Sequence, residues 1–220
     1  MKTLLIILFL SQTAFAQDSY NKISIKEVEK ETRNPKSKYY YSELMRRFDA
    51  FDTTLTPEDY RMIYFGFVFN EKYSAFPEDK SKEIRTQIDS GNFDNAIKLC
   101  DSVLQNIPVF LRANYLKGYC LFKINKEDSL AKKYFNRYFY LTDAIISTGN
   151  GLTCKSGFKV IFIADEYEVI YNYFEVEGFS GQSLSSPCDI LHIEPSDKFR
   201  YKDIYFDADE ILKKEAEMFK

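Results

Sequence analysis

The sequence predicts an α+β protein, in which a tetratricopeptide-like helical array is followed by a small, mostly antiparallel C-terminal sheet. Apolar residues recur with helical spacing from Ser19 to about Ile146. A turn-rich stretch at 148–151 then interrupts that pattern. Beyond it, short apolar segments alternate with polar connections, as strands do. We therefore expect a helical region over 17–148 and an α+β region over 149–220 that packs on the helices.

The N-terminus has the pattern of a secretory signal peptide. Lys2 precedes an apolar run over 4–10, and Ala14-Phe15-Ala16 supplies the small residues of a cleavage site. The alternative, a buried core helix, normally carries an amphipathic stripe, whereas this run is apolar on every side. We expect cleavage after Ala16, so that residues 1–16 are removed and the protein is exported, either periplasmic or secreted. No later segment is long and apolar enough to span a membrane.

The clearest helix is predicted over 56–70. Thr56 can cap it, Pro57 suits the first helical position, and the acids at 58–59 favour the positive end of the helix dipole. Large apolar and aromatic residues then cover nearly every side of the helix. This composition predicts a helix buried in the centre of the helical region.

An internal repeat is predicted over 91–143. Ala96 and Ala131 are 35 residues apart, close to the tetratricopeptide period of about 34 residues. Gly118 lies where the first helix of such a repeat has a small residue, which lets two antiparallel helices approach closely. A generic pair of helical hairpins remains the alternative. Within the second helix, the pattern predicts Tyr134 and Tyr138 in the core and Lys132, Lys133 and Arg137 on a solvated face.

The C-terminal region is expected to contain three strands. The segment 158–164 is apolar on both faces, which predicts a central strand. Two further strands at 190–193 and 204–206 are expected to form a hairpin. The segment 166–176 fits either a strand or a helix, and we favour a short helix begun by two acids. A last helix over 208–219 is expected to be capped by Asp207.

All four cysteines follow the predicted cleavage site, and an exported protein meets an oxidising compartment. Of the possible pairings we favour a disulfide between Cys154 and Cys188, because both precede predicted strands. Cys100 and Cys120 fall within apolar helical patterns, where a small buried thiol is common.

The composition excludes several classes of function. Of 220 residues, 45% are hydrophobic and 29% charged, which is typical of a globular protein and not of a disordered chain or a membrane bundle. The net charge of −3 argues against a nucleic-acid partner, which needs a basic surface. A single histidine, His192, excludes a multi-histidine metal site. We accordingly expect no metal, no cofactor and no catalytic set that is evident from sequence.

Weak candidates for ligand binding lie in the C-terminal region. Asp165 and Glu166 follow a predicted strand, where paired carboxylates can act as acid and base or bind a hard cation; acids at a helix start explain them more simply. The glycine-containing loop 178–183 is expected to be a flexible turn, and the alternative is a loop that contacts a ligand. If a small ligand binds, we expect Asp165, Glu166, Tyr167, Gln182 and Ser183 to contact it. His192 lies four strand positions from Cys188, roughly 13 Å away and too far for a Cys–His pair, so we expect a surface or packing role for it.

Several segments form a recognisable set, in chain order Asn34-Pro35, 39–41, 52–60, 64–67, 143–149, 164–167, 181–184 and 204–207. Through this set the sequence resembles a family of exported bacterial proteins, chiefly of the Bacteroides group, known as domain of unknown function 4919. The segments span nearly the whole chain beyond the predicted signal peptide. The resemblance implies export and brings no catalytic residue with it.

The function favoured at this point is a non-enzymatic envelope protein that binds a protein or peptide partner. Its basis is the repeat, because stacked helical hairpins form a concave surface. The alternative is a small-ligand-binding protein or hydrolase, with a carboxylate site where the sheet meets the helices.

Overall fold

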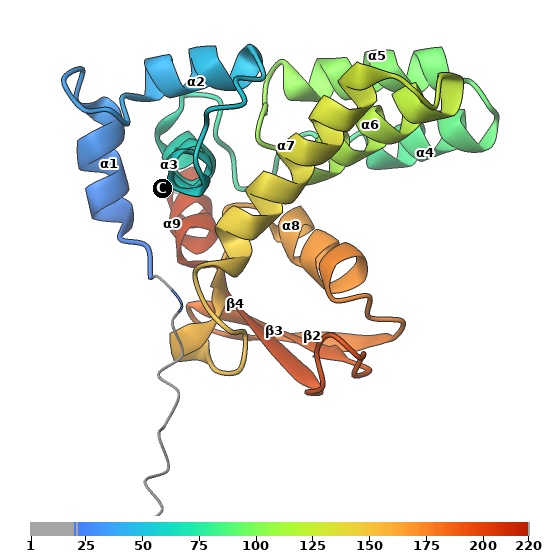
Figure 1. Ribbon diagram of the computed structural model, residues 1–220. Helices are drawn as coiled ribbons and strands as arrows, with labels where there is room; N and C mark the ends of the chain where they lie inside the picture. The colour runs from blue at the N-terminus through green and yellow to red at the C-terminus, as the bar shows by residue number, and fades with distance from the viewer. Residues whose placement is uncertain (1–19, 21, 220) are drawn as a thin grey trace, which may run out of the picture.

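The computed structural model describes residues 20 and 22–219, and the predicted signal peptide and its cleavage site lie outside the described residues. Helices form the upper part of the molecule in Figure 1, and the sheet lies below them. The α+β fold class predicted from sequence is confirmed. No helix of the described part is long and apolar enough to cross a membrane.

The first helices surround a buried central helix, α3. Its N-terminus has a capping box, in which the Thr56 side chain accepts from the Asp59 N–H and the Asp59 carboxylate accepts from the Thr56 N–H. Every residue over 59–66 is buried, which confirms the central helix predicted there. The elements of this part are α1 (Ile25–Arg33), α2 (Tyr41–Asp49), α3 (Pro57–Gly66) and the 3-10 turn η1 (Phe67–Phe69).

Four helices then pack one against the next: α4 (Ser81–Asp89), α5 (Phe93–Leu104), α6 (Leu111–Ile124) and α7 (Ser129–Ile146). Gly118 lets α6 approach α7, because a Cβ atom there would lie 3.2 Å from the Phe135 ring and 3.3 Å from the Ala131 carbonyl oxygen. Cys100 and Cys120 are free thiols buried in a cluster between α4, α5 and α6, as predicted.

The prediction that Arg137 lies on a solvated face is wrong. Arg137 is 6% exposed, and its guanidinium carbon lies 3.9 Å from the ring centres of both Phe48 and Phe51. It also donates to the Phe48 carbonyl oxygen. The rings of Phe48 in α2 and Phe51 just after it therefore cover a side of α7 that helical periodicity alone assigns to solvent.

The sheet has the strand order β1-β4-β3-β2. Its strands are β1 (Phe158–Lys159), β2 (Phe179–Ser185), β3 (Cys188–Ile193) and β4 (Asp203–Asp207). The predicted hairpin is β3 and β4, with Ile190 opposite Tyr205 in an antiparallel register. The β2–β3 pair is also antiparallel, and only the short β1–β4 pair is parallel.

Two predictions for the strands of this region are wrong. The segment 158–164 forms a two-residue strand at the edge of the sheet; residues 160–162 then run through the core, where the Phe162 ring contacts Phe67, Tyr73 and Phe110, and residues 163–164 begin a helix. Its apolar character on both faces comes from helices around it and not from neighbouring strands. The expected flexible loop at 178–183 is mostly strand, because β2 pairs along the length of β3.

Two helices complete the region, α8 (Ile163–Glu168) and α9 (Asp209–Met218). Helix α8 continues directly as the π-helix η3 (Val169–Tyr173). The short helix favoured over 166–176 is confirmed, although it begins earlier. The prediction that Asp207 is the N-cap of the last helix is wrong: Ala208 is the N-cap, while Asp207 accepts from the Asp209 N–H and pairs with Lys159.

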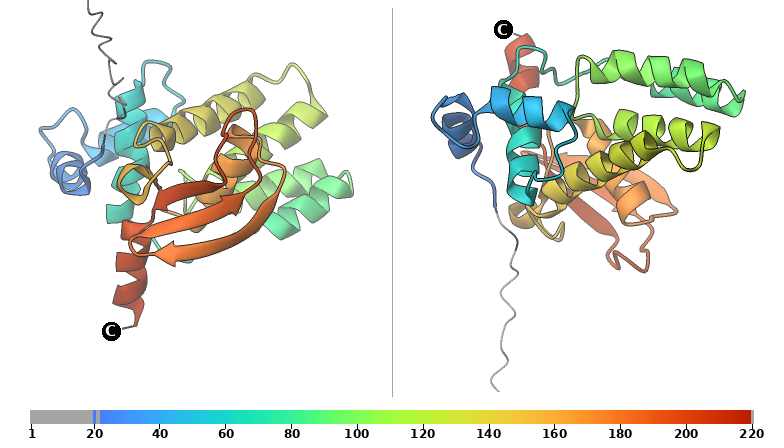
Figure 2. Two further views of the ribbon diagram at one scale, coloured as in Figure 1. Left: turned by 90° about the horizontal axis from the view of Figure 1, so that it is seen from below. Right: turned by 45° about the horizontal axis from the view of Figure 1, so that its top comes forward.

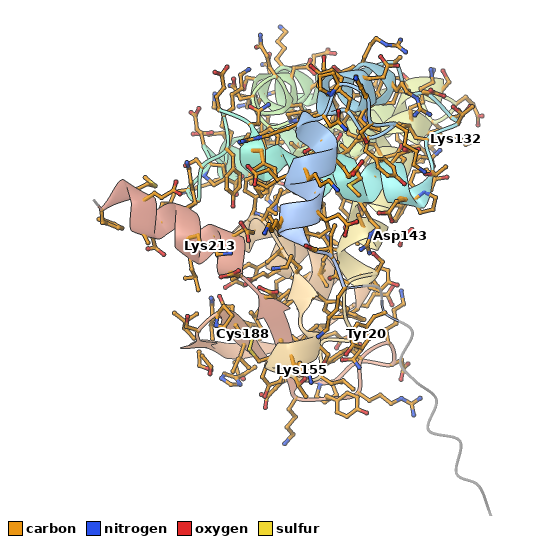
Figure 3. The ribbon with its side chains drawn as sticks, turned by 90° about the vertical axis from the view of Figure 1, so that its left-hand side faces the viewer. Tyr20, Lys132, Asp143, Lys155, Cys188 and Lys213 are labelled. Carbon is orange, nitrogen blue, oxygen red and sulfur yellow. A yellow bond between two sulfur atoms is a disulfide. The ribbon has the colours of Figure 1, made fainter. Side chains whose placement is uncertain are left out.

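One apolar core joins the helices to the sheet. It includes Leu44 and Ile63 of the helical region together with Leu191 and Phe206 of the sheet. The opposite face of the sheet has no helix over it, as the left view of Figure 2 shows. At the end of that sheet, Cys188 forms a disulfide bond with Cys154 of the 3-10 turn η2 (Cys154–Ser156), close to Lys155 (Figure 3).

Candidate functional site

Helix α8 lies between the helices and the sheet, and its acidic side chains point in different directions. Asp165 is fully buried and accepts a hydrogen bond of 2.6 Å from the Tyr64 hydroxyl of α3. The same hydroxyl oxygen accepts from the Ile161 N–H at 3.2 Å. Burial raises the pKa of Asp165 to about 8, although the Tyr64 hydrogen bond opposes the rise. Asp165 therefore acts as a packing link between α8 and α3.

Glu166 points the other way, toward Asp189 of β3. Glu166 is 0% exposed and Asp189 4% exposed. Burial, increased by the neighbouring Asp189 carboxylate, holds the pKa of Glu166 well above its usual range. Neither carboxylate oxygen of Glu166 has a hydrogen-bond partner among the described residues. The raised pKa keeps Glu166 protonated, so that two negative charges do not face each other at Glu166 and Asp189.

Tyr167 and Gln182 cover this carboxyl pair. The Tyr167 hydroxyl donates to Gln182 Oε1 at 2.8 Å, and the Gln182 amide donates to Asp189 Oδ2. The structure thus brings Glu166, Tyr167 and Gln182 together around Asp189, a residue that the sequence prediction missed. It leaves Asp165 on the other side of α8. The carboxyl pair is closed off by its own neighbours, so an open carboxylate site is not formed here.

The remaining acid of α8, Glu168, is held by Arg112 of α6 and by the Asn172 amide of η3. Its carboxylate pairs with Arg112 Nε of α6 at 2.5 Å and accepts from the Asn172 amide at 2.7 Å. Arg112 also contacts Asp79 at 3.2 Å. These contacts fix α8 against α6. Within the part of the chain that the structure describes, no group of three or more His, Cys, Asp or Glu could hold a metal ion.

Ser183 lies on the open face of the sheet, away from the other predicted residues. Its Oγ is 3.0 Å from His192 Nε2 on β3, and His192 Nδ1 is 2.7 Å from Asp203 Oδ1 on β4. The side chains of His192 and Asp203 are 40% and 49% exposed. A hydroxyl, an imidazole and a carboxylate therefore follow one another across three neighbouring strands. Sequence analysis missed this row, since only the strand register places residues 183, 192 and 203 side by side.

Strand β2 forms an edge of the sheet that the described residues leave open. Its sequence, Phe-Ser-Gly-Gln-Ser-Leu-Ser, contains no charged residue and no proline. Most of its side chains are exposed, with Leu184 at 60% and Phe179 at 38%. Backbone groups on the outer side of such a strand have no strand to pair with.

A groove of about 480 Å³ lies elsewhere, between the 146–152 segment and the connection from β3 to β4. Tyr173, Phe174, Phe199 and Tyr201 supply its aromatic lining. None of the residues predicted from sequence to bind a ligand lines this groove.

A sequence model of the family described as "Domain of unknown function (DUF4919)" matches residues 26–217. The match covers most of the chain, and the chain belongs to this family. Comparison with curated proteins gives no match, and comparison with solved structures gives none either.

Proposed function

We propose that this member of the DUF4919 family is an exported envelope protein that binds a protein or peptide partner by accepting an extended partner segment along β2. The observation that carries the proposal is the open edge of the sheet. Soluble proteins usually protect such an edge with charges, proline or a covering element. Strand β2 has neither charge nor proline over seven residues, so its backbone is available for strand addition.

The side chains along β2 indicate what kind of segment fits. Leu184 lies opposite Asp189, which points toward α8, so Leu184 projects on the same side. Phe179 also lies on this side, with its ring centre 5.7 Å from that of Tyr167. Ser183 projects to the opposite, polar side. A partner strand with apolar residues at alternate positions would bury those residues against Phe179 and Leu184 while its backbone pairs with β2.

Export rests on two supports. The N-terminal sequence has the charge, apolar run and small residues of a signal peptide. Cys154 and Cys188 form a disulfide bond, which persists in oxidising compartments such as the periplasm. N-terminal sequencing of the protein purified from its native host is expected to begin at Gln17, and a chain that begins at Met1 contradicts export.

The helical array offers a second surface for the same function. The successive packing of α4 to α7 and the close contact at Gly118 support a relation to tetratricopeptide repeats, whose stacked hairpins bind peptides on a concave side. We favour the edge strand because its outer backbone groups are free to pair with an added strand, whereas most apolar residues of α4 to α7 are packed in the core clusters. The alternative of a carboxylate-based hydrolase has less support, because Glu166 and Asp189 are covered.

The proposal is tested by selecting peptides from a displayed library on the purified chain and measuring their affinity by calorimetry. Peptides with alternating apolar residues are expected. Leu184→Lys places a charge at the edge and should lower the affinity of the selected peptides at least about tenfold, because edge charges disfavour strand pairing. Phe76→Lys is the matched control, since Phe76 and Leu184 are 58% and 60% exposed and Phe76 lies outside the sheet. Equal affinity for both variants, or selection of no peptide, contradicts the proposal.

A further inference from the structure

We propose that Ser183, His192 and Asp203 form a nucleophilic site on the open face of the sheet, which cleaves esters of small acyl groups by acyl transfer. The proposal stands on the hydrogen-bonded row across β2, β3 and β4, and its argument does not rest on the proposed partner binding. Ser183 Oγ lies 3.0 Å from His192 Nε2, and His192 Nδ1 lies 2.7 Å from Asp203 Oδ1. This is the order of groups that activates serine in acyl-transfer enzymes, and that arrangement recurs on unrelated folds.

The hydrogen bond to Asp203 determines what each nitrogen of His192 can do. A carboxylate only accepts hydrogen bonds, so it holds the imidazole with the proton on Nδ1. Nε2 then carries the free lone pair and faces the Ser183 hydroxyl. His192 can thus accept the hydroxyl proton, while Asp203 positions the ring and stabilises the imidazolium that forms.

The three side chains are held by strand pairing and not by loops. His192 is directly opposite Asp203 in the β3–β4 register, and Gly181 is opposite His192 in the β2–β3 register. Gly181 carries no side chain, which leaves the space beside the imidazole open. The Ser180 hydroxyl donates to the His192 carbonyl oxygen at 3.1 Å and ties β2 to β3 at this point.

The open edge also supplies a donor for the oxyanion. In an antiparallel edge strand, alternate residues direct their N–H groups away from the sheet. An outward N–H group therefore belongs either to Ser183 or to both of its neighbours, Gln182 and Leu184. Backbone N–H groups of the nucleophile and its neighbours are the usual donors to the tetrahedral oxyanion in acyl transfer.

The reaction balances with water as the second substrate. Ser183 Oγ attacks the ester carbonyl carbon and its proton passes to His192 Nε2; the bond to the leaving oxygen then breaks, and the alcohol takes that proton. Water next attacks the acyl-serine carbonyl carbon and gives a proton to His192. Ser183 Oγ leaves and recovers this proton, which releases the carboxylic acid.

The plain alternative is a polar row on a solvated sheet face, where cross-strand hydrogen bonds have only a small structural effect. Hydrolysis of p-nitrophenyl acetate by the whole purified chain separates the two. Ser183→Ala, His192→Gln and Asp203→Asn should each lower the rate at least about tenfold, since a positioned general base contributes roughly 10² or more. Ser185→Ala, on the same strand but opposite Cys188, is the matched control and should keep the wild-type rate.

A fluorophosphonate probe supplies an independent readout. The expected adduct forms on Ser183, as located by peptide mass spectrometry, and is lost in His192→Gln. If Ser183→Ala hydrolyses the ester at the wild-type rate, the imidazole acts alone and the proposal is overturned. An adduct on another residue, or no hydrolysis by the wild-type chain, would overturn it as well. Asp203→Asn, on β4 and away from the β2 edge, should leave the affinity of β2-selected peptides unchanged, so failure of this site and failure of the edge-strand proposal are distinguishable.

Discussion

The two faces of the C-terminal sheet carry polar groups of similar kinds in opposite environments. On the face beneath α8, the carboxyl groups of Glu166 and Asp189 are covered, and burial raises the pKa of both. On the other face, His192 and Asp203 are joined by a side-chain hydrogen bond, with both side chains at least 40% exposed. Burial thus makes the inner acids structural, while the outer row stays accessible to other molecules.

This difference teaches that the chemical type of a residue is a weaker guide to function than the face it occupies. Paired acids after an apolar segment suggested a site, yet packing closes them from solvent. The groups that remain accessible belong to β2 and the strands beside it. Adjacent residues of β3 allow a direct comparison of the two faces.

The largest effect is expected at Leu191, which is fully buried beneath α8. Leu191→Ala should lower the free energy of unfolding by about 2–5 kcal/mol, because it removes buried methyl groups and leaves a cavity. Chemical denaturation monitored by circular dichroism measures this change. A loss below about 1 kcal/mol would mean that the two faces do not differ as described.

A smaller loss is expected when the disulfide at the end of the sheet is removed. Cys154 and Cys188 are 34 residues apart, and a cross-link over such a loop typically contributes about 2–4 kcal/mol. The double variant Cys154→Ser/Cys188→Ser should therefore melt at lower temperature in calorimetry, with and without reductant. If reductant leaves the melting temperature of the wild-type chain unchanged, the bond does not form in solution.

The pH dependence of stability tests the burial of the α8 acid that points toward α3. Burial raises the pKa of Asp165 from 3.8 to about 8, so between these pH values the folded state keeps a proton that the unfolded state has lost. This group leaves stability unchanged below pH 4, and it lowers the free energy of unfolding progressively as the pH rises from about 4 to about 8. Asp165→Asn should flatten the decline from pH 4 to pH 8. If the free energy of unfolding varies with pH in the same way for the variant and the wild type, Asp165 is not a buried, protonated carboxyl group.

The smallest effect is expected on the outer face, one residue from Leu191. His192→Ala removes an exposed hydrogen bond with Asp203 and should change the free energy of unfolding by less than about 0.5 kcal/mol, because exposed polar contacts contribute little. The same denaturation experiment measures it beside Leu191→Ala. A loss comparable to that of Leu191→Ala would make His192 a structural residue.

Local features of the fold could be predicted from sequence, whereas features that depend on distant neighbours could not. The cap at Thr56 could be predicted because it depends on residues that are close in sequence, and the structure adds Asp59 as the partner of Thr56 in a capping box. The segment 158–164 was misassigned, because helices and strands can both surround an apolar run. The sequence predicts Ser183 in one ligand site with Asp165 and Glu166, whereas the structure places it on the opposite face of the sheet, beside His192. Its contact with His192 depends on how β2 pairs with β3, and no local pattern reports that register.

Hydrogen exchange tests the central claim, that the open edge of the sheet and not the buried acids or the helical array is the functional surface. The chain is measured with and without a peptide selected from the displayed library. The account predicts slower exchange at amides of Phe179–Ser185 on peptide binding, with α4 to α7 unchanged. Protection confined to α5, α6 and α7, with β2 unchanged, would contradict it and would move the binding surface to the helical array.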